Sequence, residues 1–280
     1  MTKQYLNLGC GRRFHSDWEN LDFSASSPAV CAHDLRKGIP YPDGTFDVVY
    51  HSHVLEHFSK QTARSFLQEC HRVLKRGGVI RVAVPDLEKI AQLYLEALEK
   101  ASLGIPGWKE NYDWVILEMY DQAVREQSGG ACYEYYRQEP IPNWDFVFQR
   151  AGAEAHAAMN AARAKPLSAS NRSQRVRAKL DYVFHNSGSV FRNQLARMFL
   201  SKEDYAALQV GRFRRQGEIH QWMYDGYSLA RLLQESGFPN AQRCAATESR
   251  VLNWEKYFLD SEPDGTTYKP DSMYMEAVKP

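Results

Sequence analysis

The stretch YLNLGCGRRFHSDWENLDF, residues 5–23, decides the fold class of this chain. An apolar run over 5–8 stops at the glycine turn GCG, and a second short run ends at Asp22. A strand, a glycine turn and an acid at the end of the next strand are typical of a nucleotide-binding α/β fold. However, the third glycine of a dinucleotide fingerprint is missing and the step to Asp22 is short. We therefore expect a nucleotide-like ligand without a pyrophosphate, and a first crossover helix that is very short or absent.

The first 85 residues alternate between short apolar runs and a helical pattern. The runs that we expect to form strands are 4–8, 19–23, 29–33, 46–51 and 79–84. The pattern over 61–74 predicts a helix, with KRGG (75–78) as its basic last turn and glycine stop. Short strands that alternate with helices predict a mostly parallel sheet.

After residue 85 the pattern becomes helical. Asp86 is the expected N-cap of an amphipathic helix. Further helical segments are expected over 112–127, 143–164 and 174–217. The segments that return to the α/β pattern are a helix over 225–236 and strands over 241–247 and 273–278.

These elements predict a single α/β fold. A Rossmann-like sheet of seven strands, mostly parallel with the last strand antiparallel, is expected from residues 1–85 and 218–280. Residues 86–217 are expected to form a large helical insertion that caps the substrate. Two independent domains are the less favoured alternative, because the final strands would then have no sheet of their own.

Composition limits the location and the partners of the chain. The 280 residues are 44% hydrophobic and 25% charged, with a net charge of +1, so the chain as a whole is no polycation built for nucleic acid. No apolar stretch approaches the ~18 residues that span a bilayer, and the start leads into a strand without room for a signal peptide. Five scattered cysteines without a CxxC pair favour free thiols. We expect a cytoplasmic protein.

The insertion is more basic than the rest of the chain. Residues 145–220 hold thirteen Lys and Arg against six Asp and Glu, a net charge of +7. This excess indicates either an anionic substrate or a solvated helical face. No signature of an RNA-binding module accompanies it.

Groups at three strand ends can contact the parts of one adenosine ligand. Backbone amides of the glycine turn favour an anionic group. Asp22 can accept hydrogen bonds from ribose hydroxyls, and Asp34 can accept one from an adenine amino group while Leu35 covers the ring. Each feature also has a structural interpretation, as a tight turn, a surface acid or a cap.

The segments LNLGCG, NLDF, AHDL, FDVVYHSHVLEH and LKRGGVIRVAVPD together resemble the class I S-adenosylmethionine-dependent methyltransferases, most of all the type 11 branch often associated with glycans and small natural products. The resemblance covers residues 4–95 well and 218–280 moderately. It implies S-adenosylmethionine as cofactor and S-adenosylhomocysteine as product. The cofactor-binding residues that it implies are Asn7, Gly9, Cys10, Gly11, Asp22, Phe23, Asp34, Leu35, Ser52 and His53.

By the same resemblance, the glycine turn holds the methionine end of the cofactor, and Ser52 and His53 pass beside the sulfonium. One position departs from the family. The family usually has an acid two residues before the first glycine, where this chain has Asn7. Asn7 can accept a hydrogen bond from the cofactor's amino group but cannot form the ion pair.

The segment HSHVLEH, residues 51–57, brings three histidines and one acid close together. His53 and His57 are four residues apart and can share a metal ion on one helical turn. Because HExxH is absent and no later ligand cluster is obvious, we predict no metal. The resemblance makes this segment the cofactor wall and substrate floor, with His53 lining the site and His57 either contacting substrate or serving a structural role.

Methyl transfer needs alignment of the reacting atoms, and an alcohol acceptor also needs a base. His53 and His220 are the candidates, because histidine titrates near neutral pH; a structural role is the alternative for His220. Trp222 and Tyr224 are expected either in the substrate pocket or in the core. Two further expected substrate contacts, by analogy with inserts in this fold, are Gln127 and Arg214.

The sequence therefore predicts a methyltransferase that uses S-adenosylmethionine on an oxygen, or in second place a nitrogen, of a small molecule, glycan or peptide-like metabolite. An RNA methyltransferase and an aminopropyl transferase with a decarboxylated donor are the alternatives among enzymes. A catalytically silent cofactor-binding module that acts as an interaction partner is the alternative from another class. Monomer and homodimer both stay open.

Overall fold

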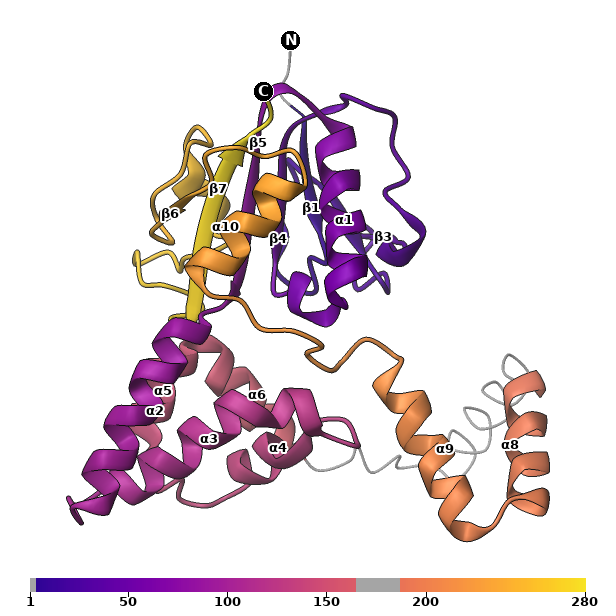
Figure 1. The fold of residues 1–280 in the computed structure, drawn as a ribbon, viewed down its shortest axis with the longest axis vertical. Helices are drawn as coiled ribbons and strands as arrows, with labels where there is room; N and C mark the ends of the chain where they lie inside the picture. Colours follow the sequence, from indigo (N-terminus) through magenta and orange to yellow (C-terminus); the bar gives the residue numbers. More distant parts are fainter. Residues whose placement is uncertain (1–3, 165–186) are drawn as a thin grey trace.

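A computed structural model of the chain describes residues 4–164 and 187–280 and contains a seven-stranded sheet in the order β3-β2-β1-β4-β5-β7-β6 (Figure 1). The strands are β1 Tyr5–Leu8, β2 Glu19–Asp22, β3 Cys31–Ala32, β4 Phe46–Ser52, β5 Leu74–Pro85, β6 Gln242–Cys244 and β7 Ser272–Val278. β1 to β5 pair in parallel, whereas β7 runs antiparallel between β5 and β6. The predicted sheet, with an antiparallel last strand, is confirmed.

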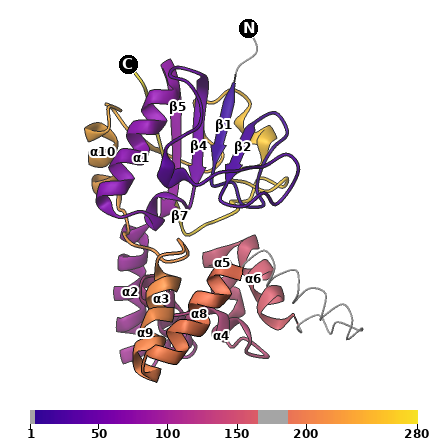
Figure 2. The ribbon, with the colours of Figure 1, turned by 90° about the vertical axis from the view of Figure 1, so that its right-hand side faces the viewer.

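Two helices, α1 (Lys60–Val73) and α10 (Gly226–Glu235), cover one face of the sheet (Figures 1 and 2). Both carry their apolar residues on the buried side, and Ser59 and Asp225 cap their first turns. The other face is covered by the chain between β6 and β7, which contains the short helix η3 (Trp254–Tyr257). The aromatic cluster on that face includes Tyr5, Trp18, Tyr50, Trp254 and Tyr257.

The segment KRGG (75–78) differs from the prediction. It does not end α1 as a basic turn with a glycine stop, because α1 ends at Val73 and β5 begins at Leu74. Leu74 is fully buried and pairs with Phe46, and the Gly77 amide donates to the carbonyl of Lys279 at 2.8 Å. Burial of Leu74 in the sheet therefore overrides the local glycine signal.

The turn after β1 is tight, as predicted, and no helix lies between β1 and β2. Gly9 has a φ of +64°, and a Cβ there would approach Val54 Cγ2 to 2.3 Å. Glycine is required at this position because the chain after β4 passes directly against the turn. This contact brings the carboxyl ends of β1 and β4 together at the point where the strand order reverses.

Seven described helices follow β5 and precede α10. They are α2 Leu87–Ser102, α3 Trp108–Val124, α4 Gly130–Tyr136, α5 Trp144–Ala151, α6 Ala153–Arg163, α8 Ser187–Phe199 and α9 Lys202–Arg214. Asp86 caps α2 through its side chain, as predicted. The helix expected over 143–164 is broken at Gly152. The one expected over 174–217 lies partly outside the described residues and is broken between α8 and α9.

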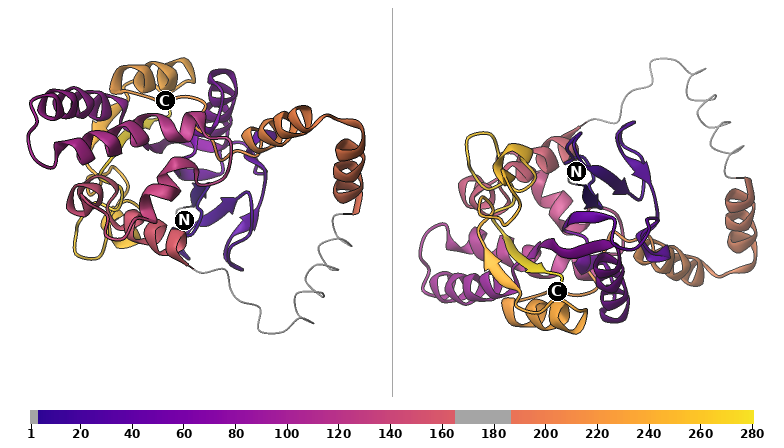
Figure 3. Two further views of the ribbon diagram at one scale, coloured as in Figure 1. Left: turned by 90° about the horizontal axis from the view of Figure 1, so that it is seen from below. Right: turned by 90° about the horizontal axis from the view of Figure 1, so that it is seen from above.

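The helices α2 to α6 lie beyond the carboxyl edge of the sheet, and α8 and α9 project to one side (Figures 1 and 3). α3 to α6 surround an apolar cluster of their own, which includes Trp114, Tyr136 and Val147. Gly152, with a φ of +61°, packs on the segment before β7, where a Cβ would lie 2.5 Å from the Tyr268 carbonyl oxygen. This contact seats α5 and α6 against the sheet edge.

Within the described ranges, none of the helices has the length and apolar character needed to cross a membrane.

Candidate functional site

Two cavities lie at the carboxyl edge of the sheet. The first, which we call the cofactor cavity, has a volume of about 270 Å³ and lies beside the ends of β1 and β2. The predicted cofactor residues that line it are Gly9, Asp22, Phe23, Asp34, Leu35 and His53. Arg215, Gln216 and Gly217, from the chain after α9, also line it.

Asp22 is held in place at the end of β2. One carboxylate oxygen accepts from the Gly11 amide at 2.9 Å, and the other accepts from the Ser24 amide at 3.2 Å. These backbone donors orient the carboxylate of Asp22 in the cavity wall.

Asp34 is engaged by a neighbour. Its two oxygens accept from Arg36 Nε at 2.8 Å and Arg36 Nη2 at 2.9 Å, and this guanidinium lowers the pKa of the carboxyl. Asp34 also caps the short helix η1 (Leu35–Lys37), so the cap role weighed in the sequence is present. An adenine amino group would compete with Arg36 for this carboxylate.

Four residues that the resemblance implied do not line the cofactor cavity: Asn7, Cys10, Gly11 and Ser52. Asn7 is buried beneath the turn, where its Nδ2 donates to Arg13 O and Asn20 Oδ1, both at 3.2 Å. The carboxamide oxygen of Asn7 is buried without a hydrogen-bond donor. Burial raises the pKa of the Cys10 thiol to about 12.

The second cavity, which we call the acceptor cavity, has a volume of about 510 Å³ and lies between the sheet edge and helices α3, α4 and α6. Aromatic rings and charged groups face it together. They are Trp114, Tyr133, Tyr136, Glu118, Arg125, Glu154, Lys269 and Asp271. His220 also lines this cavity, and His53 and His57 line both cavities.

His53 stands in the shared wall in a strained conformation, with a φ of +53°. Its amide donates to the Ala83 carbonyl at 2.9 Å, and its Nε2 lies 2.7 Å from Ser272 Oγ. Its Nδ1 lies 3.4 Å from Glu56 Oε1. Burial lowers the pKa of His53, so the ring is neutral at pH 7. Its Nε2 is already hydrogen-bonded to Ser272, which favours a positioning role over proton transfer.

The predicted histidine His220 reaches the same wall from the chain after α9. Its amide donates to the Gln122 carbonyl at 3.0 Å, and the next amide, of Gln221, donates to the Glu56 carbonyl at 2.7 Å. Its ring stacks edge-on against His57, with 4.9 Å between ring centroids. Burial, and then the charge of His57, lower the pKa of His220 to about 3.

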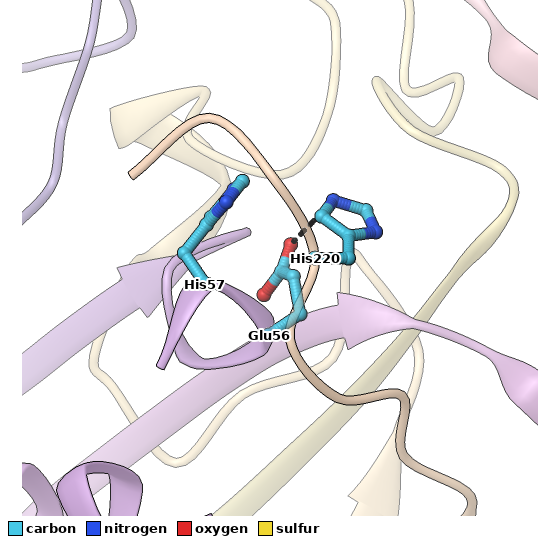
Figure 4. A group of neighbouring side chains, drawn as sticks. All are labelled: Glu56, His57 and His220. Carbon is cyan, nitrogen blue, oxygen red and sulfur yellow. Dashed lines mark ion pairs between the residues drawn. The ribbon is translucent and has the colours of Figure 1, made fainter. Parts of the chain in front are cut away.

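Glu56 is the residue of this site that sequence reasoning left without a role. It is 0% exposed, and neither carboxylate oxygen has a hydrogen-bond donor. His220 Nε2 lies 3.9 Å from its Oε1 (Figure 4). Burial raises the pKa of Glu56 to about 8.

The other expected substrate contacts do not line either cavity. Trp222 is 40% exposed and lies under the Lys60 ammonium, 3.6 Å from the ring centre. Tyr224 belongs to the core, the second of its two interpretations. Arg214 donates to the carbonyls of Ala123 and Arg125 at the end of α3. Gln127 is exposed in the loop before α4.

Lys269 and Asp271 are cavity residues that the sequence analysis missed. A signal for them existed in the topology, because the start of an antiparallel strand lies at the same edge as the ends of the parallel strands. Lys269 pairs with Glu154 at 3.1 Å. Burial, and then Glu118, raise the pKa of Asp271 to about 7. The residues from α3, α4 and α6 carried no comparable signal.

The family model that matches this chain covers part of its sheet. Residues 18–82, from β2 into β5, match the model of a family described as a methyltransferase domain. A Mycolicibacterium smegmatis protein named "Probable S-adenosylmethionine-dependent methyltransferase" is 34% identical over 101 residues, which are 30% of this chain and 38% of that protein. The matched part is therefore well under half the length of this curated relative.

Similar solved structures extend over most of the chain at low similarity. One is a chain of the complex between the Haloferax volcanii Trm112 methyltransferase activator and a methyltransferase, with a TM-score of 0.38, 12% identity, and coverage of 99% of this chain and 83% of that chain. Another is a SAM dependent methyltransferase from Archaeoglobus fulgidus, with a TM-score of 0.37, 12% identity, and coverage of 99% and 86%. At these TM-scores neither likeness carries an argument about this chain.

Proposed function

We propose that this chain, whose α/β part belongs to the class I S-adenosylmethionine-dependent methyltransferase family, transfers a methyl group from S-adenosylmethionine to an oxygen of a small molecule, glycan or peptide-like acceptor. The donor would bind in the cofactor cavity and the acceptor in the acceptor cavity, with the described helices α2 to α6 of the insertion as the lid. The observation that carries this proposal is the shared wall, because His53 and His57 line both cavities.

The lining of the cofactor cavity fits an adenosyl ligand. Asp22 presents a carboxylate that is oriented by two backbone amides and can accept from a ribose diol. Leu35, Val54 and Phe58 supply apolar surface for a ring system. Bound S-adenosylmethionine would supply an electrophilic methyl group on its sulfonium. The chain's own contribution is to align the two ligands across the wall, where orientation can lower the barrier by roughly 7–11 kcal/mol at best.

Two histidines of the wall remain candidates for taking the acceptor's proton. His220 lies in the acceptor cavity, and its neutral ring has no hydrogen bond from another side chain. His53 is bonded to Ser272 through Nε2 and is better placed to position the wall. We therefore assign the positioning role to His53 and let His220 accept the hydrogen bond of the acceptor's hydroxyl. A pKa of about 3 makes His220 a weak base at pH 7, in contrast to the neutral titration expected from its residue type.

The charges in the acceptor cavity favour an uncharged or cationic acceptor over RNA. Three acids and two bases line it, so the lining carries no excess of positive charge. Arg125 is paired with Asp121 and Glu218, and Lys269 with Glu154. A polyanion needs unpaired cations along its path, so RNA stays the second candidate. Nitrogen is the second acceptor atom.

Calorimetric titration with S-adenosylmethionine and S-adenosylhomocysteine tests the cofactor assignment. Both should bind the wild-type chain, and a ligand at a hundred times its dissociation constant should add ~2.7 kcal/mol to the free energy of unfolding. Asp22→Ala should weaken binding at least tenfold, because it removes the ribose acceptor. Asp17→Ala, which removes an exposed acid of the loop before β2, is the matched control and should bind as the wild type does. Equal affinities for both variants would refute the placement of the ribose.

A further inference from the structure

Glu56, His57 and His220 come together from two distant parts of the chain (Figure 4). One nitrogen or oxygen of each side chain lies within 4.8 Å of those of the other two. Glu56 and His57 belong to the short helix η2 (Leu55–His57) after β4, whereas His220 follows α9. Backbone hydrogen bonds join the two parts, so the side chains meet on a fixed frame.

The carboxylate of Glu56 lacks the partners that a buried acid needs. It is fully buried, and no hydrogen bond reaches either oxygen. The nearest basic atoms are His53 Nδ1 at 3.4 Å and His220 Nε2 at 3.9 Å. A buried acid in a protein is kept neutral, paired with a base, hydrogen-bonded or bound to a metal ion. Glu56 accepts no hydrogen bond, so a bound metal ion is one of the states open to it, and the geometry of its neighbours tests that state.

The orientation of His57 is that of a metal ligand. Its Nδ1 lies 3.1 Å from the carbonyl oxygen of Ile219. A carbonyl can only accept, so Nδ1 carries the proton and Nε2 offers its lone pair. A backbone carbonyl on the second ring nitrogen is the usual support of a metal-binding histidine.

The rings of His57 and His220 both line the acceptor cavity, and Glu56 does not. An ion held by all three would therefore face the acceptor cavity on its open side.

We propose that Glu56, His57 and His220 bind one divalent transition-metal ion whose remaining coordination positions open into the acceptor cavity. Two imidazoles and one carboxylate suit Zn²⁺, Co²⁺ or Fe²⁺, whereas Mg²⁺ and Ca²⁺ prefer oxygen ligands throughout. Bonds of ~2.1 Å at tetrahedral angles place ligand atoms ~3.4 Å apart, so the three atoms, now within 4.8 Å of one another, need to close by up to about 1.4 Å.

Three protein ligands with an open position are typical of catalytic rather than structural metal sites. In the acceptor cavity, such an ion would bind an acceptor hydroxyl and lower its pKa. This role rests on the proposed methyl transfer and would supply the deprotonation for which His220 alone is a weak base. The binding of the ion itself does not depend on methyl transfer.

Titration of the chelator-treated chain with Co²⁺ tests the site, because Co²⁺ in a nitrogen and oxygen site gives visible ligand-field bands. We expect bands that saturate at one equivalent and disappear when Zn²⁺ is added. Glu56→Gln and His220→Ala should each weaken Co²⁺ binding at least tenfold. His156→Ala, which removes an exposed histidine of α6, is the matched control and should leave the spectrum unchanged.

S-adenosylhomocysteine binding, measured without metal, shows that each variant is folded and keeps the two proposals separate. A wild-type chain that binds S-adenosylhomocysteine but gives no bands at one equivalent would overturn the metal site alone. Bands of wild-type strength in both Glu56→Gln and His220→Ala would overturn it as well. A wild-type chain that gives the cobalt bands but does not bind S-adenosylhomocysteine would contradict the cofactor assignment and would still support the metal site.

Discussion

Two buried polar clusters lie at different places on the sheet, and they differ in how completely their hydrogen bonds are made. In the first, which we call the sheet cluster, Arg81 donates to Asp260 at 2.7 Å, to Glu276 at 2.8 Å and to three backbone carbonyls. In the second, the wall cluster of Glu56, His57 and His220, the buried carboxylate accepts no hydrogen bond.

The difference separates structural from functional burial of charge. A cluster with every donor and acceptor matched holds its surroundings in one arrangement and has nothing left for a ligand. A buried acid with unmet bonds beside a cavity is destabilising unless something else completes it, which is why such groups mark functional sites. Changes in the sheet cluster should therefore affect stability, and changes in the wall cluster should affect binding.

The largest expected effect follows from Arg81→Met. The change leaves Asp260 and Glu276 buried without their shared cation, and breaking a buried ion pair costs about 3–5 kcal/mol. Urea unfolding at pH 7 measures it. Arg231→Met is the control, since Arg231 forms an exposed pair with Glu235 on α10 and should cost less than ~1 kcal/mol. Equal losses of stability in Arg81→Met and Arg231→Met would contradict the distinction between buried and exposed ion pairs.

His51, in β4, sharpens the comparison because its unmet groups line neither of the two cavities described above. The ring is fully buried against Phe66, and neither nitrogen has a partner. Burial lowers its pKa to about 3. The unfolded chain therefore binds a proton below about pH 6.5 that the folded chain does not, and the stability falls as the pH is lowered through this range.

His51→Leu should remove that pH dependence. We compare the free energy of unfolding of the variant with that of the wild type. This difference should be about 2 kcal/mol more favourable to the variant at pH 5 than at pH 8. Unfolding at both pH values measures this change. A difference that stays constant from pH 8 to pH 5 would show that His51 has the same pKa in the folded and the unfolded chain, and it would contradict burial of the ring in its neutral form.

The sequence predicts the cofactor cavity better than the acceptor cavity, and the reason is topological. Gly9, Asp22 and Leu35 each follow a short strand, and parallel strands end at one edge whatever the rest of the chain does. The helices of the cap are visible in the periodicity, but their placement on the edge depends on packing such as that of Gly152 against Tyr268. That contact joins residues more than a hundred positions apart, and no local sequence pattern predicts it.

His220 is a residue of the acceptor cavity that the sequence does predict. The return of the chain from the insertion to the sheet predicts that His220 lies near the cleft, and it lines the acceptor cavity. The sequence places Glu56 beside the histidines of residues 51–57, but it does not show that Glu56 is buried, because acids are usually exposed. The neighbouring Trp222 and Tyr224 do not line the cavity. The sequence could not predict this, because the directions of side chains in an irregular segment follow no period.

The smallest expected effect on stability is that of Glu56→Gln, and the same chemical change in the sheet cluster provides its comparison. Asp260→Asn removes a carboxylate that accepts from Arg81 and from the Tyr50 hydroxyl, and it places amide protons against the arginine, so we expect a loss of about 2–4 kcal/mol. Glu56→Gln removes a carboxylate that accepts no hydrogen bond, so its loss should be within about 1 kcal/mol.

Urea unfolding of these two variants in chelator, beside the Co²⁺ titration of each, makes the comparison direct. Asp260→Asn should lose stability and keep the cobalt bands, whereas Glu56→Gln should keep stability and lose them. A loss of several kcal/mol in Glu56→Gln without metal would mean that the wall carboxylate already stabilises the fold by itself. The unmet bonds of Glu56 would then be no sign of a ligand, and the contrast between the two clusters would fail at the residue on which it depends most.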